Sequence, residues 1–270
     1  MDSRRLERIV LIILALLNVF LLSVVLSDGA EARRSRAETV ASVTALLEEN
    51  GIAVSDGAIE LRSAPAPSVL TRDILRENEK VRKLVGDYTQ EDVGGNIIFY
   101  RGEKGQALLR GSGEMDVLME KGTVPLRGGQ ERTARRVLRS IGITAVPTDP
   151  EGGGTDYYCA LEGMPVYNAV LNFSFSDSSL TLLTGTRLFD AVTKSEEAVG
   201  MDSVSALLRF VEIVRSEGYI CSRLDGMAPG YLMDVTRSGE AQLTPVWRIE
   251  TDTGSLMIDA VTGKVENRLT

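Results

Sequence analysis

The stretch "TPVWRIETDTGSLMIDAVTGKVE" (residues 244–266) alternates apolar and polar side chains in two short runs. Trp247 and Ile249 share one face of the first run, and Leu256 and Ile258 share one face of the second. The letters "TDTG" between the runs are typical of a chain reversal. The sequence therefore predicts an antiparallel hairpin anchored by a tryptophan.

A second tight turn follows in "AVTGKV" (residues 260–265). Gly263 suits a positive φ, and the Asp259 carboxylate can accept hydrogen bonds from nearby backbone N–H groups. We interpret Trp247, Ile249, Asp259 and Gly263 as structural residues of this hairpin.

Three other segments share one pattern, in which an apolar helical stripe is followed by a glycine stop and a short extended run. They span residues 37–54, 130–146 and 201–224, with stops at Gly51, Gly142 and Gly218. Their apolar stripes consist of Val40, Val43, Leu46 and Leu47; of Ala134, Val137, Leu138 and Ile141; and of Val204, Leu207, Leu208, Val211 and Val214. Asp202 or Ser203 is the expected N-cap of the third helix.

The segments between these helices alternate as antiparallel strands do. Strands are expected near residues 96–101, 106–110 and 114–119, and in two runs within 165–188 that are joined at Asp177-Ser178. Strands follow strands without helical crossovers, which argues against a doubly wound parallel sheet. The sequence therefore predicts an α+β fold.

The segment "EKGTVPLRGG" (residues 120–129) is interpreted as a hinge between two domains. We expect a first α+β domain at residues 36–124 and a second at 125–270, which ends in the hairpin. Each is expected to be an antiparallel sheet packed with a helix.

The run from Ile9 to Leu26 holds eighteen residues without a charge, which predicts a transmembrane helix. At about 1.5 Å per residue it would be roughly 27 Å long, close to the hydrocarbon thickness of a bilayer. This length favours an uncleaved anchor over a secretory signal, although Ala30-Glu31-Ala32 leaves cleavage open. Residues 1–35 are thus expected to form a cytoplasmic N-terminus, the membrane anchor and a juxtamembrane segment.

The orientation follows from the flanking arginines, three on each side of this run. Those on the N-terminal side lie closer to the apolar run, which favours a cytoplasmic N-terminus and an extracytoplasmic body. Beyond residue 36 the chain carries 24 basic and 34 acidic side chains, a formal net charge of −10. A body of this charge repels nucleic acid.

The sequence contains no histidine, which excludes Ser-His and Cys-His catalytic pairs and His-ligated metal sites. It also lacks Gly-x-Ser-x-Gly and Ser-x-x-Lys. We therefore expect no enzyme, no cofactor and no metal. Cys159 and Cys221 are the two cysteines. The sequence is compatible with two alternatives: a disulfide between them, or two free thiols that behave as small apolar side chains.

Asn18 lies in the middle of the apolar run. A lone amide there is unfavourable, and a hydrogen bond to a neighbouring helix recovers about 0.6–2 kcal/mol. Asn18 belongs to a set of residues that recur about every 3.5 positions and so share one face of the helix, which we call the seam. The seam consists of Leu11, Ala15, Asn18, Leu22 and Val25. We hypothesise that this seam contacts a partner's transmembrane helix; the alternative is one tolerated polar residue in a simple anchor.

The closing segment resembles the hairpin of PepSY-type modules, with the pattern P-x-W-x-[IV]…[ND]-A-x-T-G-x-[IV]. The start of the chain resembles that of the YycI family, single-pass envelope proteins that act with their relative YycH. This likeness is carried by Met1, Asp2, Arg4, Arg5, Leu17, Asn18, Phe20 and Leu21, while Ser3 departs from the aromatic residue expected there.

The resemblance implies a regulator of a WalK-like two-component sensor histidine kinase that controls cell-wall homeostasis. Such a protein acts through transmembrane contacts together with a YycH-like partner. The alternative is a PepSY-like envelope binding module that inhibits or chaperones a cell-wall hydrolase or protease.

Overall fold

The computed structural model describes residues 34–150, 152–194 and 200–269. Over these residues the protein is a mixed α+β fold with a large, mostly antiparallel sheet. The predicted membrane span at residues 9–26 lies outside this part of the chain. Within the described part, no helix has the length and apolar character needed to cross a bilayer.

The helices are the N-terminal helix (residues 34–49), α2 (Ile74–Val85), α3 (Gln130–Ile141) and α4 (Ser203–Ser216). The strands are β1 (Ala53–Val54), β2 (Ser68–Thr71), β3 (Tyr88–Gly94), β4 (Ile97–Gly102), β5 (Gly105–Arg110), β6 (Glu114–Met119), β7 (Ala145–Pro147), β8 (Asp156–Leu161), β9 (Met164–Ser176), β10 (Ser179–Thr186), β11 (Ala191–Lys194), β12 (Arg223–Val235), β13 (Ala241–Thr251), β14 (Gly254–Asp259) and β15 (Val265–Leu269).

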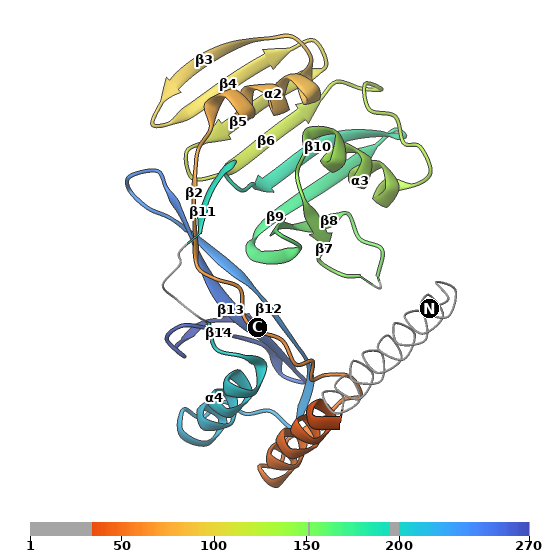
Figure 1. Cartoon of the computed structure of the whole chain (residues 1–270). Helices are drawn as coiled ribbons and strands as arrows, with labels where there is room; N and C mark the ends of the chain where they lie inside the picture. Colours follow the sequence, from red (N-terminus) through yellow and green to blue (C-terminus); the bar gives the residue numbers. More distant parts are fainter. Residues whose placement is uncertain (1–33, 151, 195–199, 270) are drawn as a thin grey trace, which may run out of the picture.

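The strands join in the order β11-β2-β13-β12-β9-β10-β6-β5-β4-β3, with β14 added to β13, β15 to β14, β8 to β9 and β7 to β8. Two pairings in this part of the chain are parallel: β1 with β12, and β12 with β9. Figure 1 shows α2 and α3 side by side against one face of the upper sheet, while α4 and the N-terminal helix lie at the far end of β12 and β13.

The two largest hydrophobic clusters in the described part of the chain hold most of these elements together. The large core draws on α2, α3, β4 to β6 and β8 to β10; it includes Val81, Val85, Leu109, Val117, Ala134, Leu138, Leu171 and Leu183. The small core comprises Val43, Leu47, Ile52, Ala58, Leu207, Phe210, Val211, Ile213, Leu224, Ile249, Leu256 and Ile258.

The large core includes residues on both sides of the domain boundary that was expected between residues 124 and 125. Strand β6 pairs with β10, so the sheet continues from one predicted domain into the other. Helix α3 and strands β8 to β10 share the large core with α2 and β4 to β6. The segment 120–129 therefore joins β6 to α3 within one core, and its Leu126 N–H donates to the Ser178 carbonyl.

The strands β12 and β13 connect the two cores. They pair in antiparallel register from Leu224↔Thr251 to Val235↔Ala241. The end of the pair near the turn between the two strands places Met233 and Leu243 in the large core. The opposite end places Leu224 and Ile249 in the small core.

The predicted hairpin is formed by β13 and β14. Trp247 lies opposite Ile258, and Ile249 lies opposite Leu256. The Trp247 indole is fully buried, and its Nε1 donates to the Met201 carbonyl at 3.0 Å. The tryptophan therefore fixes the segment that leads into α4 against the hairpin.

Helix α4 buries most of the predicted stripe: Leu207 and Val211 lie in the small core, and Val204 and Val214 pack against it. The exception is Leu208. Leu208 is 50% exposed, whereas Phe210 is fully buried in the small core. The helix is apolar on several sides, so spacing alone does not select the face. The larger area of the phenyl ring selects it, because burial stabilises roughly in proportion to apolar area.

The two corresponding truncations should therefore differ in effect. We expect Phe210→Ala to lower the free energy of unfolding by about 3–5 kcal/mol, because it leaves a cavity in a packed core. Leu208→Ala, the matched control on the same helix, should change it by about 0.5 kcal/mol or less. Urea unfolding followed by circular dichroism measures both; equal effects would contradict the observed face.

Candidate functional site

The site with the most buried charge is built around α2, a helix that the sequence patterns above did not predict. The Asp73 side chain caps it by accepting hydrogen bonds from the N–H groups of Leu75 and Arg76, at 3.0 and 3.1 Å. Val81 and Val85 face the large core. This register also turns Glu77, in the first helical turn, toward the interior, where it is 1% exposed.

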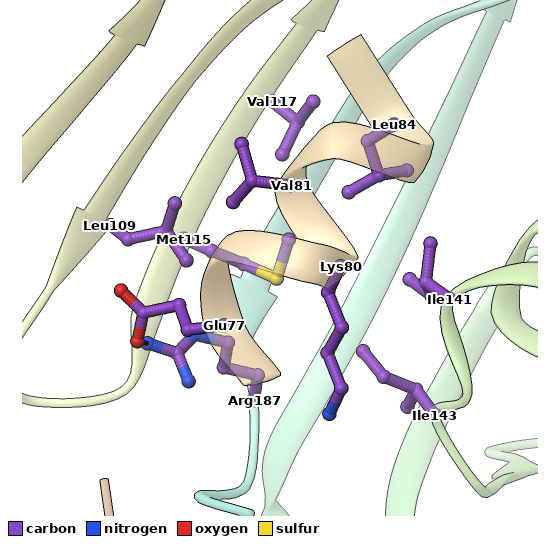
Figure 2. Close-up of a pocket in the computed structure, with 10 residues that line it drawn as sticks. All are labelled: Glu77, Lys80, Val81, Leu84, Leu109, Met115, Val117, Ile141, Ile143 and Arg187. Atoms are coloured by element: carbon purple, nitrogen blue, oxygen red, sulfur yellow. Dashed lines mark hydrogen bonds and ion pairs between the residues drawn. The ribbon is translucent and has the colours of Figure 1, made fainter. Parts of the chain in front are cut away.

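The Glu77 carboxylate binds two guanidinium groups. Arg72 contacts both oxygens, with Nε–Oε2 at 2.7 Å and Nη2–Oε1 at 2.6 Å. Arg187, which follows β10, forms a second ion pair with Oε2. The Tyr100 hydroxyl lies 3.4 Å from Oε1 and donates to Asn78 Oδ1 at 3.0 Å. Figure 2 shows the Glu77 and Arg187 side chains meeting beneath α2.

A separate ion pair lies beside those of Glu77. Lys80, one helical turn after Glu77, pairs with Asp190. We call Arg72, Glu77, Lys80, Arg187 and Asp190 the buried charge cluster. It links three separate segments: the end of β2, helix α2 and the connection between β10 and β11.

The electrostatics of the cluster favour a charged carboxylate. Burial raises the pKa of Glu77, but hydrogen bonds and charge from Arg72 and Arg187 outweigh this effect and hold it below its ordinary value. Burial lowers the pKa of Arg187, against the opposing charge of Glu77. Burial, followed by the charge of Glu77, raises the pKa of Tyr100 to about 12.

The hollow beside this cluster is too small for a substrate. It measures about 10 Å³ and is lined mainly by apolar side chains of α2, β5, β6 and the end of α3 (Figure 2). A volume of roughly 10–15 Å³ holds one water-sized sphere. The Glu77 carboxylate also has ion-pair or hydrogen-bond contacts at both oxygens. We therefore interpret the buried charge cluster as a structural clamp on α2.

The partner-binding seam predicted at Leu11, Ala15, Asn18, Leu22 and Val25 lies outside the described residues. The hairpin residues lie together at the small core and its border. The Asp259 Oδ1 accepts hydrogen bonds from the N–H groups of Val261 and Thr262, at 2.7 and 2.9 Å. Gly263 has φ +72°, which an L side chain rarely adopts.

The structure does not form the disulfide, because Cys159 and Cys221 are both free thiols. Cys159 is fully buried in the large core, whereas Cys221 packs at the edge of the small core. The two cysteines thus belong to different cores. Burial raises the pKa of Cys159 to about 12, and burial followed by the charge of Asp252 raises the pKa of Cys221.

Sequence reasoning missed the buried charge cluster. A usable signal was present for α2: Asp73 as an N-cap residue and the spacing of Val81, Leu84 and Val85. No local signal marks Glu77 as buried, because Arg187 lies 110 residues further along the chain. Among the described residues, no group of three or more Cys, Asp or Glu side chains is placed to hold a metal ion.

Comparison with known proteins assigns no family to the chain. No family model matches it, and no curated protein matches it. The YycI resemblance therefore stays a prediction.

Two solved structures align with the chain at low similarity. An uncharacterized protein from Eubacterium rectale ATCC 33656 has 12% identity and a TM-score of 0.47, over 80% of this chain and 89% of that one. The Bacillus megaterium YpeB C-terminal domain has 11% identity and a TM-score of 0.36, over 74% of this chain and 99% of that one.

Removing the carboxylate charge tests the clamp. We expect Glu77→Gln to lower the free energy of unfolding at pH 7 by about 3–5 kcal/mol, because two guanidinium groups lose their partner. The folded-state pKa of Glu77 lies below its unfolded value, so the stabilisation is present above the unfolded pKa and is lost as pH falls through the folded pKa. The difference between wild type and variant should therefore shrink on acidification below about pH 4.3.

Urea unfolding of the full-length chain at a series of pH values measures this difference. Glu79→Gln is the matched control, because Glu79 is exposed on the same helix. A Glu77→Gln variant as stable as the Glu79→Gln variant would refute the clamp.

Thiol labelling tests the cysteine assignment. In the native protein we expect N-ethylmaleimide to leave Cys159 unmodified and to modify Cys221 slowly, because the thiolate is the reacting form and both pKa values are raised. In denaturant without reductant, both thiols should react. Intact mass spectrometry counts the labels, and a requirement for reductant would instead indicate a disulfide.

Proposed function

We propose that the protein is a membrane-anchored extracytoplasmic regulator of a WalK-like two-component sensor histidine kinase that controls cell-wall homeostasis. In this proposal residues 9–26 span the cell membrane, the N-terminus is cytoplasmic and the body is extracytoplasmic. Regulation runs through transmembrane contacts with the kinase and a YycH-like partner, at the seam that carries Asn18.

One observation supports a membrane helix that does more than tether. The predicted span ends at Leu26, and the chain is helical from residue 34 to residue 49 in the described part. Val43 and Leu47 of this helix are buried in the small core together with Phe210 of α4. A helix inserted into a packed core moves with that core, because packed interiors resist deformation.

Further contacts fix the connection after this helix. Strand β1 pairs in parallel with β12, through Ala53↔Arg223 and Val54↔Leu224. The Ser55 hydroxyl donates to Asp225 Oδ1 at 3.0 Å, and the Arg215 guanidinium contacts the Asn50 amide oxygen. A displacement of the N-terminal helix is therefore expected to reach the β12–β13 pair through this packing.

Substituting the seam amide tests the proposal. We expect Asn18→Leu to weaken helix pairing about 3- to 30-fold, which corresponds to the loss of roughly 0.6–2 kcal/mol of interhelical hydrogen bonding. Phosphorylation of the response regulator in cells should change accordingly. The matched control is Ser23→Leu, because at roughly 100° per residue Ser23 lies on another face of the same helix.

Both variants must be present in the membrane fraction at wild-type level. Unchanged phosphorylation in Asn18→Leu, or equal change in both variants, would count against the seam. Exogenous protease on intact cells checks the orientation, and a body that is protected in the cytosol would overturn the proposal.

The second candidate function is an envelope binding module that inhibits or chaperones a cell-wall hydrolase or protease. It is favoured by an open hollow of about 320 Å³ between α3 and β7. Replacing residues 9–26 with an unrelated transmembrane segment distinguishes the two functions. Lost regulation supports the membrane-helix regulator, and retained activity supports the binding module.

A further inference from the structure

A groove runs along the outer side of α3. Its first part is the hollow of about 320 Å³ between α3 and β7, lined by Arg135, Leu138, Arg139, Ile143, Val146 and Tyr157 among others. Its second part is a hollow of about 540 Å³ at the start of α3, which shares Arg135 with the first. We call the two hollows together the α3–β7 groove.

One wall of the groove is the free edge of a strand. Among the described residues, β7 pairs with β8 alone. The Thr144 carbonyl accepts from the Ala160 N–H at 2.8 Å, and the Thr148 N–H donates to the Asp156 carbonyl at 3.0 Å. Hydrogen bonding alternates along an antiparallel strand, so the N–H and C=O of Ala145 point away from β8. Pro147 also faces outward but has no N–H, so an added strand can pair with the N–H and C=O of Ala145 and with the C=O of Pro147.

The floor of the groove is apolar. Leu138 and Tyr157 are buried, and Ile143 is half-buried. Side chains of an added strand would alternate between this surface and solvent. An apolar side chain facing the groove would cover the exposed part of Ile143, which is favourable because it removes apolar area from water.

The other wall is strongly basic, although the chain as a whole carries a net charge of −8. Arg132, Arg135 and Arg139 line the groove from the exposed side of α3, and Glu131 lines its second part. Arg135 pairs with Glu131 at 2.6 Å. Arg132 and Arg139 have no acidic partner within ion-pair distance in the described part of the chain. The groove therefore complements a negatively charged occupant.

We propose that the α3–β7 groove binds an extended acidic segment of a partner protein, which adds a strand to β7. Its backbone pairs with Ala145, an apolar side chain lies on Ile143, and its carboxylates contact Arg135 and Arg139. This combination fits a peptide better than a phosphate polymer, because a polymer of phosphates would use the arginines but neither the strand edge nor the apolar floor. The inference does not rest on the kinase proposal.

Direct binding of a defined probe tests the groove. The probe is a fluorescein-labelled hexapeptide EVEVEV, titrated with the full-length protein and followed by fluorescence anisotropy. We expect it to bind at least about tenfold more tightly than KVKVKV, which keeps the apolar side chains and reverses the charge. The same peptide N-methylated on alternate residues should lose binding, because it lacks N–H groups for the strand edge.

A charge reversal in the groove gives the matched protein variant. We expect Arg139→Glu to weaken EVEVEV binding at least about tenfold, because a charge-assisted hydrogen bond is lost and a repulsion is added. Arg237→Glu, an exposed arginine in the turn between β12 and β13, is the control and should bind as wild type does. Circular dichroism of both variants must match wild type, and the peptide should slow amide exchange over residues 143–148.

Three results would overturn the proposal: no preference for EVEVEV over KVKVKV, equal binding of the N-methylated peptide, or equal loss in both arginine variants. Competition by inorganic polyphosphate combined with indifference to N-methylation would mark the groove as a polyanion surface instead. The Asn18→Leu variant should bind the peptide normally, so failure of the groove and failure of the kinase proposal are separate results.

Discussion

The antiparallel pairing of β12 with β13 is the constraint on which the rest of the described structure depends. These two strands are long enough to reach both hydrophobic cores, so they hold one core at each end. Met233 and Leu243 belong to the large core, whereas Leu224 and Ile249 belong to the small core. A change in register at one end would move side chains at the other, because a shift of one residue exchanges the two faces of a strand.

The two ends of this pair carry different features. At the small core, the helix over residues 34–49 packs with α4 and the hairpin. At the large core, the buried charge cluster fixes α2 beside α3, and α3 presents its arginines outward. In the two proposals above, the small-core end carries the membrane helix and the large-core end carries the peptide groove.

The charge cluster stabilises this arrangement in a way that apolar packing does not. A buried carboxylate between Arg72 and Arg187 has defined directions of contact, so it favours one position of α2. Breaking such a pair is costly because the remaining charge stays in a poorly solvated place. The specificity of the α2 position is therefore tied to residues from three distant segments.

The sequence by itself determined the elements whose signals are local: α3 with its apolar stripe and Gly142 stop, and the hairpin with Trp247 and Ile249. It also indicated the α+β class, since strands follow strands without helical crossovers. Only the tertiary structure decided the burial of Phe210 in place of Leu208 on α4, the undivided large core, and the burial of Glu77 with two arginines. The physical reason is that spacing within a segment encodes its own periodicity, whereas the partner of a strand or of a buried charge is set by contacts between residues that lie far apart in the chain.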